Sequence, residues 1–169
     1  NGQKMGKSYN NFITLEQFFT GNHPLLEKAY SPMTIRFFVL SAHYRGTVDF
    51  SNEALVAAEK GLEKLMNAIA DLDRVQVSAQ CDAETEKIVK ALRQKCYDAM
   101  NDDFATPQVI SNLFEACTVV NKLIDHKATI CADCLAELKE VMHLFAEDIL
   151  GLSMHNAQCT MHNGGDARE

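Results

Sequence analysis

Four consecutive stretches between residues 51 and 151 repeat their apolar side chains every three or four residues. That period places the apolar side chains of each stretch on one face of a helix, whereas a half-buried strand would alternate every second residue. The four apolar faces comprise, in chain order, Leu55, Ala58, Leu62, Leu65, Met66, Ile69 and Leu72; Ile88, Val89, Leu92, Cys96 and Met100; Val109, Ile110, Leu113, Phe114, Cys117, Val120 and Ile124; and Leu135, Leu138, Val141, Met142, Phe145, Ile149 and Leu150. Because short connections separate the stretches, the pattern predicts a four-helix bundle.

Start and stop signals for helices flank these stretches. Ser51 and Asp82 precede the first and second stretches, where a short polar side chain caps exposed backbone N–H groups. Thr106 and Pro107 open the third, with Pro at a position whose missing N–H costs nothing. The fourth begins near residue 131 and stops at Gly151.

Shorter helices are expected before residue 51. Thr14 and Gln17 have the spacing of a capping box for a helix that ends at Gly21. Ser31 and Pro32 start a second helix, and the apolar run that follows is expected to pack into the core.

The expected fold class is therefore all-α, with short helices over residues 13–50 and the bundle over residues 51–151. No strand pattern and no nucleotide-binding βαβ unit are present in the 169 residues. Residues 1–12 are polar and contain glycine, as in a flexible loop, and residues 152–169 look like a linker or disordered tail. The chain opens on Asn1 without an initiator Met, so we expect a piece of a longer protein.

The net charge of −7 is unevenly distributed. Residues 1–50 carry five Lys and Arg against three Asp and Glu, whereas residues 51–150 carry ten against eighteen. Attraction to phosphates is therefore concentrated in the first segment. The acidic bundle gives no compositional support for nucleic-acid binding.

The cysteines and the hydropathy bear on the compartment. No apolar run approaches the roughly 18 residues of a membrane span, and no signal-peptide pattern opens the chain. The chain has six cysteines: Cys81, Cys96, Cys117, Cys131, Cys134 and Cys159. Because most of them fall within helix-like stretches, we expect reduced thiols in a cytoplasmic protein.

One pair of cysteines has the spacing of a zinc site. Cys131 and Cys134 form a C-x-x-C, and Cys159 with His162 would complete four ligands. Because the first pair begins a helix and the second lies in the expected tail, we favour ordinary helix residues and expect no metal in this chain.

Lys4 and Lys7 flank Gly6 and are followed by Ser8. A flexible backbone lets both ammonium groups turn toward one polyphosphate, where lysine acts as a compact charge with rotatable donors. The first Gly and the preceding strand of a P-loop are absent. Taken alone, the motif favours a solvated loop over a polyphosphate site.

Five stretches, in order and spacing, resemble the class I aminoacyl-tRNA synthetases. Lys4 to Ser8 resembles the KMSKS loop, Tyr9 to Thr14 resembles LGNFxT, and Ile35 to Phe38 resembles LRFFLL. Ala42 to Arg45 is similar to the AHYR, and Met100 to Pro107 to the MDDDFNTP, of the cysteine-specific members. The resemblance covers residues 3 to about 151.

The resemblance implies roles for individual residues. Lys7 would contact ATP and stabilise the departing pyrophosphate as the loop closes, with Lys4 assisting and Ser8 in the same ATP loop. Gly6 stands where the family has Ser and is expected to loosen the loop. Residues 13–50 would face the inner corner of the tRNA.

Two residues of that segment are candidate tRNA contacts. Arg45 lies in the only net-positive segment, and His43 is close to it in sequence. For both, a structural role is the alternative, and for His43 it is the better one. Asp102 and Asp103 precede Thr106, and we expect them to complement the dipole of a helix N-terminus, not to bind metal.

The implied reaction of the whole protein is ATP-dependent attachment of cysteine to tRNA(Cys). The bundle would be of the DALR, anticodon-binding type, and the family's zinc would lie in a catalytic domain outside this chain. No His-x-Gly-His occurs here, so this piece alone is not expected to activate cysteine. No membrane or DNA partner is expected. Two alternatives stay open: the related ligase that joins cysteine to an amino-sugar inositol in mycothiol synthesis, and a stand-alone helical interaction module.

Overall fold

A computed structural model describes residues 6, 11–43, 45–46 and 48–153 of the chain. Within these ranges every regular element is helical, which confirms the all-α prediction. The elements are α1 (Leu15–Thr20), α2 (Pro32–Leu40), α3 (Asn52–Asp71), the 3₁₀ turn η2 (Leu72–Arg74), α4 (Ala83–Asn101), α5 (Thr106–Ile124), α6 (Ala132–His143) and the π-helical η3 (Leu144–Ile149).

The helices begin where the sequence places caps. The Ser51 hydroxyl accepts from the N–H of Ala54, and the Asp82 carboxylate accepts from the N–H of Thr85. Thr14 and Gln17 form a complete capping box before α1. These short-range bonds confirm the predicted starts, because a cap depends only on residues three positions apart.

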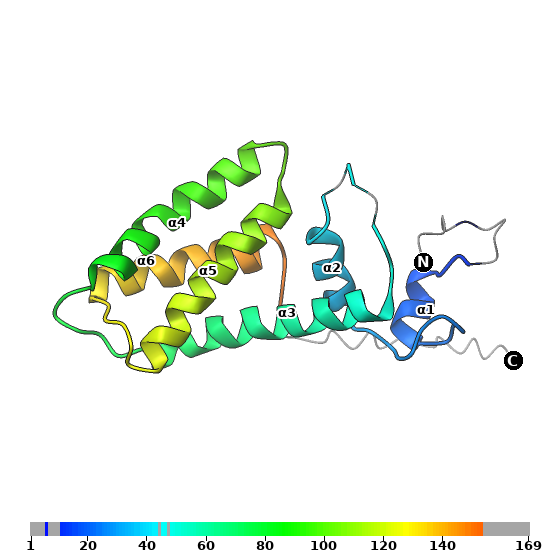
Figure 1. Cartoon of the computed structure of the whole chain (residues 1–169), viewed down its shortest axis with the longest axis horizontal. Helices are drawn as coiled ribbons and strands as arrows, with labels where there is room; N and C mark the ends of the chain where they lie inside the picture. Colours follow the sequence, from blue (N-terminus) through cyan, green and yellow to red (C-terminus); the bar gives the residue numbers. More distant parts are fainter. Residues whose placement is uncertain (1–5, 7–10, 44, 47, 154–169) are drawn as a thin grey trace, which may run out of the picture.

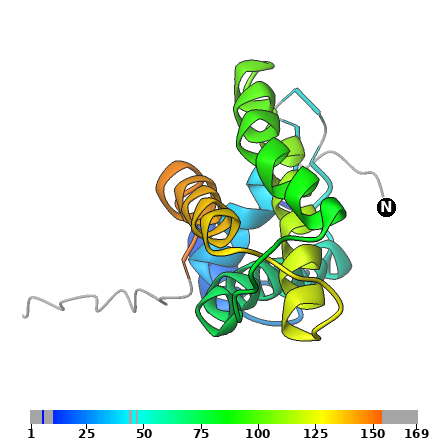
Figure 2. The ribbon, with the colours of Figure 1, turned by 90° about the vertical axis from the view of Figure 1, so that its left-hand side faces the viewer.

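Long helix α3 forms the base of the molecule (Figure 1). Helix α2 packs along the first part of α3, and α5 packs across α3 while contacting α4. Viewed along the long axis, α4, α5 and α6 gather on one side of the base (Figure 2). Their shared core includes five side chains with no exposed surface: Leu65, Leu113, Leu138, Met142 and Phe145. Burying a side chain of this size contributes roughly 1.5–3 kcal/mol.

The segment before residue 51 shares the core of the bundle. Phe37 is 3% exposed and its ring meets the ring of Phe114 edge-on, with centroids 6.3 Å apart. The Thr106 hydroxyl donates to the carbonyl oxygen of Leu40 at 2.7 Å, which links the end of α2 to the start of α5. Leu152 is also buried, at 1% exposure. The predicted boundaries at residues 12, 50 and 151 stay predictions.

The connection between α4 and α5 differs from the expectation. Asp102 is the C-cap of α4, and Asp103 and Phe104 have left-handed φ angles of 55° and 52°. The N-cap of α5 is Ala105, without a side-chain cap, and the first turn of α5 has no acidic residue. The prediction that Asp102 and Asp103 complement the dipole of α5 is therefore wrong, because the chain turns sharply before α5 begins.

Among the described residues, no helix is both long enough and apolar enough to cross a membrane.

Candidate functional site

The predicted ATP loop lies almost entirely outside the described residues. This holds for Lys4, Lys7 and Ser8, whose ATP roles stay predictions. Gly6 is described, and its N–H donates to the side-chain oxygen of Asn11 at 2.9 Å. Since Asn11 belongs to the same resemblance as the loop, this bond ties the motif to the residues that follow it.

The turn after α2 carries His43 and Arg45. The N–H of Arg45 donates to Nδ1 of His43 at 3.2 Å, and the N–H of Gly46 donates to the His43 carbonyl at 2.7 Å. His43 therefore shapes the backbone of the turn, in keeping with the structural role weighed for it. Both side chains are exposed.

Arg45 forms an ion pair with Asp103 from the α4–α5 connection. Nη2 of Arg45 lies 3.1 Å from Oδ2 of Asp103, and the two side chains are 68% and 46% exposed. A pair this exposed contributes at most about 1 kcal/mol. The structure thus brings together two stretches that are far apart in the sequence, and it leaves the Arg45 side chain largely exposed.

Phe104 is beside this pair and was not singled out from the sequence. Its side chain is 70% exposed, and its φ of 52° lies in the left-handed region. A left-handed conformation costs a residue other than Gly roughly 1–2 kcal/mol, and exposing a phenyl ring forgoes its burial. The N–H groups of Phe104 and Ala105 donate to the carbonyls of Met100 and Ala99, at 3.2 and 3.0 Å, and hold the strained turn.

Three residues therefore form one candidate surface, which we name the Arg45 corner: Arg45, Asp103 and Phe104. The hydrogen bond from Thr106 to the carbonyl of Leu40 holds the Arg45 corner in place, because this bond joins the end of α2 to the start of α5. The Arg45 corner exposes a cation, a carboxylate and an aromatic ring to solvent. Cations bind phosphates and aromatic rings stack on unpaired bases, so the arrangement suits RNA.

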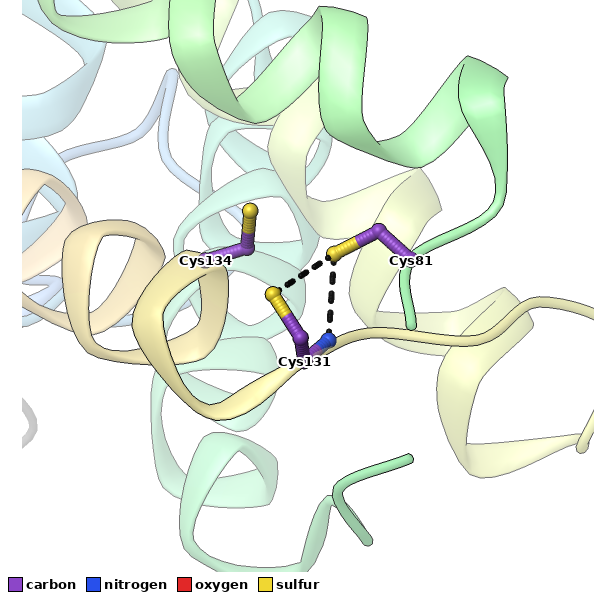
Figure 3. A group of neighbouring side chains, drawn as sticks. All are labelled: Cys81, Cys131 and Cys134. Carbon is purple, nitrogen blue, oxygen red and sulfur yellow. Dashed lines mark hydrogen bonds between the residues drawn. The ribbon is translucent and has the colours of Figure 1, made fainter. Parts of the chain in front are cut away.

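A second group of side chains lies at the opposite end of α4. Cys81 precedes α4, Cys131 is the N-cap of α6, and Cys134 lies one turn into α6. Their three ligand atoms lie within 4.8 Å of one another. Figure 3 shows the three side chains together. The Cys81 thiol donates to Sγ of Cys131 at 3.1 Å, and the N–H of Cys131 donates to Sγ of Cys81 at 3.0 Å.

The surroundings of these thiols affect their ionisation in opposite directions. The backbone N–H of Cys134 and the thiol of Cys81 hold the pKa of Cys131 below its ordinary value. Burial, together with the two neighbouring sulfurs, raises the pKa of Cys134 to about 12. The residues expected to complete a four-ligand site with Cys131 and Cys134 are Cys159 and His162, which lie outside the described residues. The third sulfur that the structure supplies is that of Cys81.

Two segments of the chain match known protein families. Residues 1–60 match the family model described as "tRNA synthetases class I (C) catalytic domain", and residues 95–154 match the DALR domain. A cysteine–tRNA ligase of Parabacteroides distasonis is 61% identical over 152 residues, which is 90% of this chain and 30% of that protein. This chain belongs to the cysteine–tRNA ligase family.

Other cysteine–tRNA ligases also match most of this chain. The enzyme of Porphyromonas gingivalis is 54% identical over 99% of this chain and 33% of its own length. The more distant enzyme of Pelobacter propionicus is 35% identical over 90% of this chain and 32% of its own length. The chain therefore spans about a third of the length of the curated relatives it matches.

Proposed function

We propose that the whole protein attaches cysteine to tRNA(Cys) at the expense of ATP, and that this chain supplies its ATP-binding loop and a helical tRNA support. The observation that carries the proposal is the 61% identity to a protein named cysteine–tRNA ligase over 90% of the chain. Matches to a synthetase catalytic domain and to the DALR domain support the division of labour.

In this proposal Lys7 and Lys4 act on the phosphates of ATP, with Ser8 in the same loop. Negative charge builds up on the pyrophosphate as the adenylate forms. A lysine brought in by loop closure therefore stabilises the transition state more than the bound substrates. Gly6 leaves the spacing of the two lysines intact.

Cysteine-dependent exchange of pyrophosphate into ATP tests this step in the full protein. Lys7→Ala should slow the exchange about a hundredfold or more while cysteine binding stays nearly unchanged. A normal exchange rate in the Lys7→Ala protein would refute the role of Lys7. Absence of exchange in the unaltered protein would favour a helical interaction module without an enzymatic reaction.

The tRNA would meet the chain at the Arg45 corner. Arg45 would exchange its ion pair with Asp103 for a phosphate, and Phe104 would stack on an unpaired or terminal base. Exposure of 68% for Arg45 and 70% for Phe104 makes both side chains accessible to a large partner. His43 would support this contact by holding the turn.

The acidic bundle limits where else the tRNA can bind. Several of its carboxylates are neutralised by ion pairs between elements, including Lys95 with Glu115, Lys122 with Glu84 and Lys139 with Asp73. Residues 51–150 still carry ten cations against eighteen anions. Binding by the chain alone should therefore be weak, because the excess of carboxylates repels phosphates. It should also depend strongly on salt, because the contacts that hold the tRNA are those of cations with phosphates.

A cytoplasmic location and a zinc ion in the catalytic domain belong to the same proposal. The five described cysteines are free thiols, which suits a reducing compartment. The alternative of an amino-sugar ligase shares the loop and a helical domain. It differs in its acceptor, so the identity of the cysteine acceptor separates the two.

A further inference from the structure

The group of Cys81, Cys131 and Cys134 lies outside the ATP loop and the Arg45 corner, so the proposed reaction gives it no role. Three thiols whose sulfurs all lie within 4.8 Å of one another satisfy the first requirement of a soft-metal site. Cys81 and Cys131 are partly exposed and Cys134 is 8% exposed, so an ion has a route in from solvent.

The backbone around the group holds the sulfurs together. Two chain segments that are about fifty residues apart run side by side here. The N–H of Ser78 donates to the carbonyl of Ile130 at 2.8 Å, and the N–H of Asp82 donates to the carbonyl of Thr129 at 3.2 Å. The Asp82 carboxylate caps α4 and also accepts from the N–H of Thr129 at 2.9 Å. The ligands are therefore positioned by the fold before any metal arrives.

The local electrostatics favours a thiolate at Cys131 and disfavours one at the buried Cys134. Cys131 and Cys134 lie in the first turn of α6, where the unpaired N–H groups carry partial positive charge. The sulfurs converge between α6 and the start of α4 (Figure 3). A divalent cation would offset the mutual repulsion of three thiolates and the burial that disfavours a thiolate at Cys134.

We propose that Cys81, Cys131 and Cys134 bind one zinc ion, or a similar soft divalent cation, that joins the start of α4 to the start of α6. The ion replaces three thiol protons, which pass to the buffer, and nothing is oxidised or reduced. Water takes the fourth tetrahedral position. Because the ion joins two helix starts at the end of the bundle away from the Arg45 corner, its role is structural, and the site does not depend on the proposed tRNA charging.

Ordinary buried thiols and a Cys81–Cys131 disulfide are the two competing accounts. Neighbouring thiols within hydrogen-bonding distance occur without metal, and the Cys81–Cys131 contact of 3.1 Å would also suit oxidation. The accounts differ in metal content and in the number of titratable thiols. A metal site protects three thiols reversibly, a disulfide removes two until it is reduced, and plain thiols do neither.

The test uses the 169-residue chain, purified under reducing conditions, stripped with a chelator and titrated with ZnCl₂ or CoCl₂. The expected result is about one equivalent of zinc per chain, with an intense thiolate-to-cobalt absorption band in the cobalt form. Cys81→Ser, Cys131→Ser and Cys134→Ser should each weaken zinc binding at least about tenfold. Cys117→Ala removes a cysteine buried elsewhere in the core and should leave zinc binding unchanged.

Circular dichroism reports whether each variant keeps its helices. The cobalt spectrum of the unaltered chain tests the site even if a variant fails to fold. Cys159→Ser with His162→Ala should retain the metal; loss there would overturn the assignment of water as the fourth ligand. The proposal is overturned by absence of a thiolate–cobalt band in the reduced chain, by equal zinc affinity in Cys81→Ser and the unaltered chain, or by loss of two titratable thiols without bound metal.

Discussion

Nε of Arg36 donates to the carbonyl oxygen of Leu150 at 2.7 Å, between residues 114 positions apart in the chain. The guanidinium also lies against Gly151, where an added Cβ would come within 2.7 Å of Nη2. Gly151 has a φ of +65°, which ends the π-helical turn and frees the Leu150 carbonyl for this bond. The segment that carries the synthetase match at one end of the chain is therefore fastened to the last turn of the DALR-matching region.

Gly151→Ala should destabilise the chain by about 1–2 kcal/mol, because Ala is strained at this φ and its Cβ displaces the Arg36 guanidinium. Urea unfolding of the two proteins measures the difference. In an Arg36→Ala background the same change should cost less, since only the backbone strain remains. Arg74→Ala, at a side chain 71% exposed, is the control and should change stability by less than about 0.5 kcal/mol. Equal costs of Gly151→Ala in both backgrounds would contradict the contact.

Asp103→Asn should tighten tRNA binding to the full protein by about twofold, because it removes the anion that competes with phosphate for Arg45. Asn tolerates a left-handed φ well, so the turn is preserved. Arg45→Ala should weaken binding and reduce the slope of log K against log salt by about one. Filter binding at several salt concentrations gives both values. If the two substitutions change affinity in the same direction, Arg45 acts through its ion pair and not through a phosphate.

Phe104→Gly should stabilise the chain by about 1 kcal/mol, since Gly adopts a φ of 52° without strain and the phenyl ring is mostly exposed. The same substitution should weaken tRNA binding by about 1–3 kcal/mol if the ring stacks on a base. Phe104→Tyr keeps an aromatic face and is the matched control for binding. Unchanged tRNA affinity in Phe104→Gly would show that the exposed ring serves another purpose.

Glu137→Gln should make the chain less sensitive to acid. Nε and Nη2 of Arg93 donate to the two carboxylate oxygens of Glu137, at 2.7 and 3.0 Å, and this charge-assisted pair holds the pKa of Glu137 below its ordinary value. A lowered folded-state pKa contributes stability that is present above the ordinary pKa and is lost as the pH falls through the lowered one. Urea unfolding between about pH 5 and pH 3 should therefore show a shallower decline for Glu137→Gln.

At pH 7 that variant should be less stable than the unaltered chain by up to about 1 kcal/mol, because the pair is partly exposed. Arg93→Met provides the control background, in which the substitution of Glu137 should no longer change the pH profile. A profile that still differs there would mean that another partner lowers the pKa of Glu137.

Local and global features of this fold were predictable to different degrees. Thr14, Ser31, Ser51 and Asp82 cap helices as predicted, because capping joins residues only three positions apart. The bundle followed from the apolar period, which reports on burial along the whole length of a helix. The caps and the apolar period both depend only on residues that are close together in the sequence.

The relationships that matter for function join distant segments, and no local signal reports them. Arg45 meets Asp103 only because α2 and α5 are packed on α3, and Asp103 was misassigned to a helix start because its left-handed φ has no marker such as glycine. Cys81 joins Cys131 only because two loops pair their backbones. Arg45 and His43 were named as candidates through a family resemblance, whereas Phe104 is noticeable only once its exposure and φ are known.

The identity of the molecule that accepts cysteine tests the proposed reaction most directly. The full protein that contains this chain is incubated with ATP, radiolabelled cysteine and either a tRNA(Cys) transcript or an amino-sugar inositol acceptor. We expect cysteine esterified to the tRNA and released by mild alkali, and no amide product with the amino sugar. Formation of the amide without cysteinyl-tRNA, or of neither product by a protein that still exchanges pyrophosphate into ATP, would contradict it.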